Sequence, residues 1–135
     1  DHDGYERFSH PVRHRRELRA DWLNRSWRVT DHLFSPMSGS HPHRLEWTLT
    51  FAPHCSLQPA EHGWSVVTPR QRFWLDGPRL SANGTPVAIS PYLDEGTVAE
   101  QYGRARRAPF LRWSWEGSLP VEGVFTIVSL EPRSA

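Results

Sequence analysis

Lysine is absent from this 135-residue sequence, and cysteine occurs only once, at Cys55. A single cysteine excludes an internal disulfide framework and any multi-cysteine zinc site. No apolar run approaches the roughly 18 residues that span a bilayer, so we expect a soluble chain without a membrane span. Sixteen arginines against fifteen acidic residues give a formal charge of +1, which leaves no whole-chain basis for binding nucleic acid. Any charged site must therefore be local.

The sequence also lacks the motifs of nucleophilic hydrolysis. It contains no Gly-x-Ser-x-Gly turn that would lift a serine into an attacking position. Cys55 follows His54 directly, but adjacent residues of a strand face opposite ways, so a structural thiol is the favoured interpretation. A free-standing hydrolase is therefore the remotest of the functions considered.

Short strands dominate the pattern that is present. Twelve prolines and nine glycines divide the chain, and no long window shows the 3.6-residue apolar period of a helix. Apolar residues alternate with polar ones over residues 45–51 in the two-residue period of a strand. These apolar residues are Leu45, Trp47, Leu49 and Phe51. We predict an all-β antiparallel sandwich of two layers, supersandwich-like and with few or no helices, as one domain over residues 1–135.

Further strands and turns follow from the same reasoning. We predict strands at Val12 to Ala20, Trp22 to Leu33, Gly63 to Thr68, Arg72 to Leu75, Arg79 to Ala82, Pro86 to Ile89, around Leu111 to Trp115, and at Gly123 to Leu130. Turns are predicted at Asp21 as a tight hairpin, at Ser35 to Ser40, at Asp76 to Pro78 as a sharp reversal, and at Asn83-Gly84. Residues Ser90 to Gly96 are expected to be less regular.

Two charged residues fall on predicted apolar faces. Asp31 lies on the core side of its strand, and Arg16 lies among the apolar residues of the strand before it. An unpaired buried carboxylate is costly, so Asp31 should bond to a turn or meet an arginine.

Aromatic and basic residues supply the candidates for binding. Trp27, Trp47, Trp113 and Trp115 fall on apolar faces and are expected in the core or an interface. Trp64 and Trp74 are less constrained, and they are the candidate aromatic platforms for a sugar. The run Arg104-Ala105-Arg106-Arg107, after Tyr102, is the strongest local positive charge. It is either a solvated loop or a binding edge where guanidinium groups meet uronate carboxylates or sulfates.

Histidines supply the candidates for a metal site. In His41-Pro42-His43 the two imidazoles would point to one side of a strand. Two ligands do not make a site, and such motifs also arise by chance among surface histidines, so no metal site is assigned. His2 beside Asp3 allows the same pair of interpretations, a ligand pair or a solvated turn.

Four segments in a fixed order resemble the C-terminal part of heparinase II/III-like proteins. They are His2-Asp3-Gly4-Tyr5, Pro11-Val12-Arg13-His14-Arg15-Arg16, Trp27-Arg28-Val29-Thr30-Asp31-His32-Leu33 and Gln101-Tyr102-Gly103. The resemblance runs from Asp3 to about Glu131. It implies a bacterial parent protein, located in the periplasm or cell envelope, in which an N-terminal helical toroid joins a β-sandwich. Such an enzyme cleaves an acidic polysaccharide by β-elimination beside a uronate.

The same resemblance implies where the chemistry lies. In the family, the catalytic histidines and the ligands of a divalent metal such as zinc precede the His-Asp-Gly-Tyr segment, so we assign no catalytic residue and no cofactor to this chain. The chain opens on Asp1 and is expected to be a C-terminal fragment. Its expected partners are the toroid and, through the parent, an acidic polysaccharide, contacted by Tyr102, Arg104, Arg106, Arg107, Trp64 and Trp74. A non-catalytic carbohydrate-binding or domain-packing module is the alternative.

Overall fold

A computed structural model describes residues 2–5, 9–37, 39 and 41–130, which form eleven strands and no helix. The strands are β1 (His2–Tyr5), β2 (Val12–Asp21), β3 (Ser26–Phe34), β4 (Pro42–Thr50), β5 (Ser56–Ala60), β6 (Gly63–Val67), β7 (Arg72–Ala82), β8 (Thr85–Val87), β9 (Tyr92–Gln101), β10 (Arg104–Ser118) and β11 (Val121–Leu130). Within this part of the chain no helix is long and apolar enough to cross a membrane.

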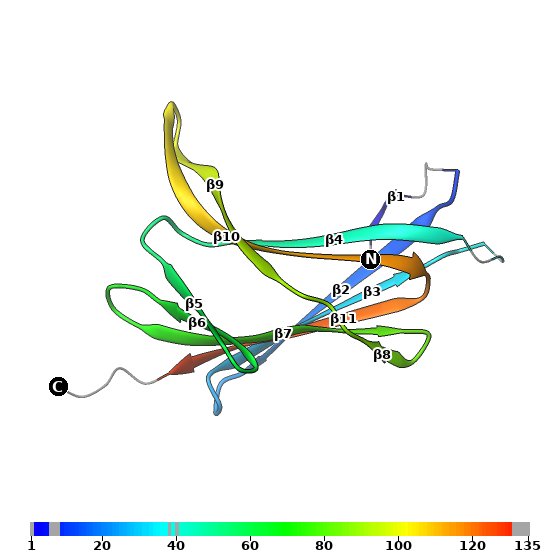
Figure 1. Cartoon of the computed structure of the whole chain (residues 1–135), viewed down its shortest axis with the longest axis horizontal. Helices are drawn as coiled ribbons and strands as arrows, with labels where there is room; N and C mark the ends of the chain where they lie inside the picture. Colours follow the sequence, from blue (N-terminus) through cyan, green and yellow to red (C-terminus); the bar gives the residue numbers. More distant parts are fainter. Residues whose placement is uncertain (1, 6–8, 38, 40, 131–135) are drawn as a thin grey trace.

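The strands form two antiparallel sheets that face each other, which confirms the predicted sandwich (Figure 1). The larger sheet has eight strands in the order β1-β2-β3-β11-β7-β6-β5, with β8 paired to β7. The smaller sheet has three strands in the order β4-β10-β9. Because the smaller sheet is so much narrower, it covers only part of the larger one.

The core lies between the sheets and follows the predicted alternation. On β4, Trp47 is buried, and its cross-strand neighbour on β10 is Trp113, which is 1% exposed. Leu75 of β7 is equally buried and comes from the opposite layer. Burying a large apolar side chain contributes about 1.5–3 kcal/mol, so these residues supply much of the stability of the sandwich.

The hairpin between β2 and β3 differs from the prediction. β2 continues through Asp21, and the turn occupies residues 22–25, which were predicted as strand. The Asp21 carboxylate accepts backbone hydrogen bonds from Leu23 and Asn24, both at 3.1 Å, and Arg25 adopts a positive φ of 48°. Local hydrogen bonding of this kind competes with strand pairing. The apolar alternation of Leu23 with Trp27 therefore indicated a strand where a turn exists.

The segment Asp76-Gly77-Pro78 is a bulge and not the predicted reversal. β7 passes through it without a break, so the two short strands predicted on either side are one. Gly77 and Pro78 together oppose the single residue Phe125 of β11, and the pairing register shifts there. Gly77 has a φ of 99°, which favours glycine, and bulges tolerate a proline that lacks an N–H donor.

Residues 83–96 show one confirmed turn and two further differences from the prediction. Asn83-Gly84 forms the predicted two-residue hairpin, with φ values of 51° and 79°. The strand predicted at Pro86 to Ile89 is the shorter β8, and the stretch expected to be irregular contains the start of β9. β9 was missed because Asp94, Glu95 and Gly96 disfavour strands in isolation.

Candidate functional site

The β9–β10 hairpin extends beyond the sandwich as an arm (Figure 1). Residues 110–118 of β10 pair with β4 on one side, whereas residues 104–108 pair with β9 alone. Gly103 closes the turn with a φ of 75°, and Tyr102 beside it is fully exposed. The run of arginines, for which the sequence left open a solvated loop or a binding edge, lies on a strand, because β9 supplies a pairing partner that was not predicted.

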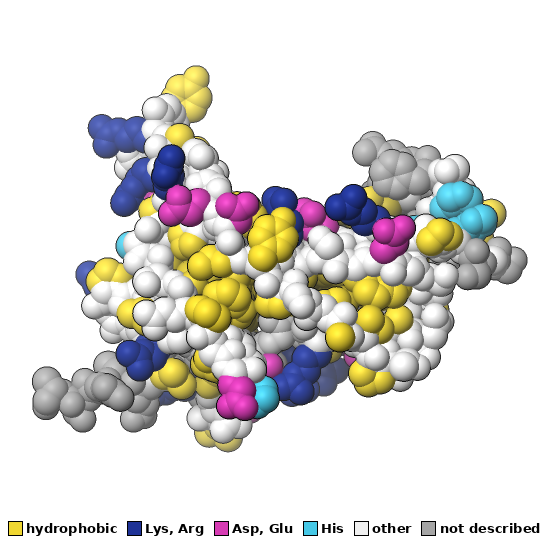
Figure 2. All heavy atoms as spheres, in the orientation of Figure 1, with side chains coloured by type: hydrophobic (Ala, Val, Ile, Leu, Met, Phe, Trp, Pro, Cys, Tyr) yellow, Lys and Arg dark blue, Asp and Glu magenta, His cyan; other side chains and the backbone are white. Residues whose placement is uncertain are grey.

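We define the basic arm as residues 97–107. It holds three arginines and one glutamate, so its formal charge is +2. Arg106 Nη1 donates a hydrogen bond to Glu100 Oε2 at 2.9 Å, and Arg107 Nη1 lies 3.4 Å from Glu95 Oε2 at the base of the arm. Within the described part of the chain, Arg104 has no ion pair. The arm thus combines a surplus of positive charge with an exposed phenol ring, and Figure 2 shows the basic side chains gathered on it.

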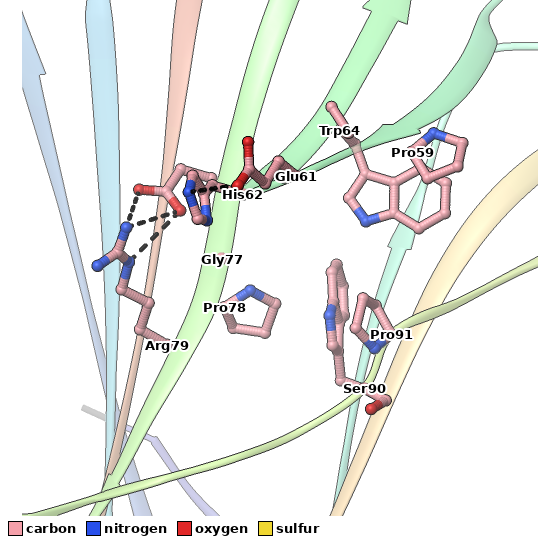
Figure 3. Close-up of a pocket in the computed structure, with 13 residues that line it drawn as sticks. Pro59, Glu61, His62, Trp64, Gly77, Pro78, Arg79, Ser90 and Pro91 are labelled. Atoms are coloured by element: carbon pink, nitrogen blue, oxygen red, sulfur yellow. Dashed lines mark hydrogen bonds and ion pairs between the residues drawn. The ribbon is translucent and has the colours of Figure 1, made fainter.

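Trp64 is buried and does not form an exposed platform on the surface. Its side chain is only 8% exposed and lines a cleft of about 620 Å³, hereafter the Trp64 cleft (Figure 3). Pro59 lies against the Trp64 ring, and Pro78 and Pro91 stand across the cleft. Trp113 also lines it, and its indole N–H is buried without a hydrogen-bond partner in the structure described. Gly77 and Pro78 of the β7 bulge are part of the cleft wall.

The charged groups of the Trp64 cleft are paired among themselves. Arg79 Nη2 lies 2.9 Å and 3.2 Å from the two carboxylate oxygens of Asp76, and His62 Nε2 lies 3.8 Å from Glu61. With two carboxylates and one guanidinium, the cleft carries a formal charge of −1 when His62 is neutral. An acidic polysaccharide therefore has no electrostatic attraction to it.

Trp74 belongs to neither the arm nor the cleft. It sits half-buried on β7, and its ring packs so closely over Gly63 that a Cβ there would lie 3.1 Å from Trp74 Cζ2. The exposed tryptophan of the chain's described part is Trp22, with 79% exposure. Trp22 was not among the predicted platforms, and the Asp21-x-x-Asn24 pattern of a turn was the signal that would have indicated its exposure.

The histidines gather where β2 and β4 begin. The rings of His10 and His41 stack with their centroids 3.8 Å apart, and His43 lines a hollow beside them. Burial lowers the pKa of His43, and the charges of His10 and His41 lower it further. Among the described residues no group of three His, Cys, Asp or Glu could hold a metal ion, and the side chains of His2 and Asp3 lie outside that description. Within residues 9–37, 39 and 41–130 there is therefore no donor set that fits the zinc implied by the resemblance.

One comparison identifies the family. The family profile described as Heparinase II/III-like, C-terminal matches residues 1–116, from β1 through most of β10. A search of curated proteins finds no significant match. The matched segment includes Arg16, Asp31 and the whole basic arm. Because the match covers 116 of 135 residues, the chain belongs to the heparinase II/III-like family, in its C-terminal region.

Proposed function

We propose that the chain is the C-terminal β-sandwich of a polysaccharide lyase that acts on a uronate-containing acidic polysaccharide by β-elimination. In this proposal the sandwich supports the fold of the parent enzyme, and the basic arm contacts the substrate. Family membership supports the reaction class, and the surplus charge of the arm supports the acidic substrate. The positive charge of the arm is the single observation on which the proposed substrate class rests.

The chemistry of the arm suits an anionic sugar. A guanidinium presents several N–H donors in a plane, which match the two oxygens of a carboxylate or the oxygens of a sulfate. Arg104 is available for this role without breaking an ion pair described in the structure. The phenol of Tyr102 next to it offers a flat ring and a hydroxyl to the same sugar unit.

The reaction itself is assigned to the rest of the parent. β-Elimination needs a base for the proton at C5, an acid for the leaving oxygen and a positive group for the developing enolate. We place these groups, and a divalent metal such as zinc, in the segment preceding His2, beside the helical toroid. No step of the reaction is routed through residues of this chain.

A second candidate function is a non-catalytic module that binds carbohydrate or packs against another domain. The exposed apolar pair Trp22 and Leu23 favours it, because large apolar side chains in water commonly mark an interaction surface. This module would retain the arm as a binding element but would have no role in lining a lyase cleft.

A titration tests the role of the chain in contacting an acidic substrate. The chain is titrated with heparin, alginate, hyaluronan and a neutral glucan at several salt concentrations, while the absorbance of unsaturated uronate is recorded. The proposal expects binding to at least one acidic glycan, weakened by salt, with no new absorbance. Absence of binding to all three acidic glycans would overturn the substrate-contacting role and leave domain packing. Growing absorbance would show that the chemistry was wrongly placed outside this chain.

A further inference from the structure

The β2–β3 turn projects from the edge of the molecule opposite to the basic arm (Figure 1). Its conformation is held by Asp21, whose carboxylate accepts a hydrogen bond from Asn24 Nδ2 at 2.7 Å as well as two from backbone N–H groups. The hydrogen bonds from Asn24 lower the pKa of Asp21. The carboxylate is therefore charged, but its oxygens are already engaged within the turn.

The turn exposes its apolar side chains to an unusual degree. Trp22 is 79% exposed and Leu23 is 96% exposed. The ring of Trp22 meets that of Trp27 edge-on, with centroids 6.5 Å apart and planes inclined at 82°. Despite this contact most of the Trp22 side chain stays in water, which is the arrangement of a platform.

Two arginines stand directly opposite each other beside this platform. Arg19 of β2 and Arg28 of β3 are cross-strand partners on the outer face of the larger sheet. Like charges in this register repel each other. Arg19 reaches Glu17 at only 3.8 Å, with its side chain 81% exposed, and Arg28 has no ion pair among the residues described. The fold thus retains a repulsive pair that an anion would neutralise.

These groups share one hollow, hereafter the Trp22 hollow, with a volume of about 590 Å³. Trp22 and Leu23 form its apolar wall, and Arg19 and Arg28 supply two positive charges against the single carboxylate of Asp21, a formal charge of +1. The lining is completed by Ala20, Ser26 and Thr126. A sugar presents an apolar C–H face to a ring, hydroxyl groups to serine and threonine, and, where it is acidic, an anion to the arginines. Apart from the Asp21 carboxylate, whose oxygens are engaged within the turn, each class of group in the hollow therefore has a counterpart on an acidic sugar.

From these observations we infer that the Trp22 hollow is a second glycan-binding site, which takes a sugar residue bearing a carboxylate or a sulfate. The inference shares only its ligand class with the proposed function. The two sites lie on opposite edges of the molecule, so each can be removed without touching the other.

The test uses the 135-residue chain and three hexasaccharide probes: alginate for carboxylates, heparin for carboxylates with sulfates, and a neutral glucan. Binding is measured by calorimetry in the Arg104→Ala/Arg107→Ala background, where the arm is disabled. We expect residual binding of an acidic probe, reduced at least tenfold by Trp22→Ala or by Arg19→Gln/Arg28→Gln. Trp22→Phe should retain part of the binding, because it keeps a flat ring. The preferred acidic probe identifies the anion.

The matched control is Arg70→Gln/Arg72→Gln, which removes two exposed charges outside both sites. It should leave the residual binding within about twofold, since exposed charges act weakly at a distance in salt. Thermal unfolding verifies the fold of each variant. The Arg19→Gln/Arg28→Gln variant should be no less stable than the unsubstituted chain, because it removes a repulsion between like charges.

The outcomes separate this inference from the proposed function. If the arm substitutions abolish all binding, the Trp22 hollow is not a glycan site while the arm remains one. If Trp22→Ala abolishes binding and the arm substitutions change nothing, the hollow stands and the arm loses its role. Binding of the neutral glucan as tightly as the acidic probes would overturn the choice of ligand. If Trp22→Ala instead abolishes a self-association detected by sedimentation and leaves glycan binding unchanged, a second copy of the chain is the occupant and the inference falls.

Discussion

Asp31 accepts hydrogen bonds from its cross-strand partner Arg16 at two points, from Nε at 2.7 Å and from Nη2 at 2.9 Å. His14 Nε2 lies 2.7 Å from the same carboxylate. Asp31 is completely buried, whereas the side chain of Arg16 is half-exposed. The two charged residues that the alternating pattern placed on apolar faces are therefore partners in one ion pair, which accounts for both.

Asp31→Asn should destabilise the fold by about 2–3 kcal/mol. Removing one partner of a fully buried pair costs about 3–5 kcal/mol, and the exposure of Arg16 reduces that value. Urea denaturation measures the change, with the exposed Glu116→Gln as control, which should stay within about 0.5 kcal/mol. A loss in D31N no greater than in the control would show that the pair is structurally unimportant.

Acid should weaken the fold through the same carboxylate. Burial raises the pKa of Asp31, but the hydrogen bonds from Arg16 and His14 outweigh it, and the pKa lies below its ordinary value. The folded protein therefore holds the proton less tightly than the unfolded chain does. The stabilisation is complete above the ordinary aspartate pKa of about 3.9 and is lost as the pH falls through the lower folded value. Unfolding free energies measured from pH 6 to pH 2 should fall less steeply below pH 4 in D31N.

Gly77→Ala should be far more damaging than the same change at Gly103. Both residues have positive φ, which costs alanine about 1–2 kcal/mol. At Gly77 the added Cβ would also lie 2.6 Å from the carbonyl oxygen of Val124, whereas at Gly103 nothing lies within 4 Å. Thermal and urea unfolding should separate the variants by at least about 2 kcal/mol. Equal losses would mean that the bulge relaxes around the methyl group.

Arg104→Ala/Arg107→Ala should weaken retention on an acidic-polysaccharide column while hardly changing thermal unfolding. The Arg107–Glu95 pair is highly exposed, and exposed pairs contribute about 0–1 kcal/mol. The Arg70→Ala/Arg72→Ala variant removes equal charge elsewhere and controls for net charge. Unaltered elution of the arm variant would remove the arm from the proposed function.

The sequence predicted those features that depend on neighbours along the chain. The alternation of Leu45 and Trp47, the Asn83-Gly84 turn and the need of Asp31 for a partner all follow from local chemistry. The family segments, read in order, led to the heparinase II/III-like assignment that the profile match bears out.

Features that depend on distant pairing escaped prediction. The bulge at Gly77-Pro78 exists because β11 continues past it, and the basic run is a strand because β9 lies alongside. The exposure of each tryptophan depends both on local turns and on packing against distant segments. Trp64 and Trp74 are partly or fully covered by residues of other segments of the chain. Trp22 is exposed because it lies in a turn, and only Asp21 and Asn24 indicate that turn in the sequence.

The continuity of β10 has a mechanical consequence. One unbroken strand of 15 residues carries the arginines of the arm at one end and the buried Leu111 and Trp113 further along. There is no linker or joint between the part that would hold a polymer and the part that anchors the sandwich. Tension applied by a polysaccharide at the arm would therefore pass along the main chain of β10 directly into the core, with no intervening loop to absorb it.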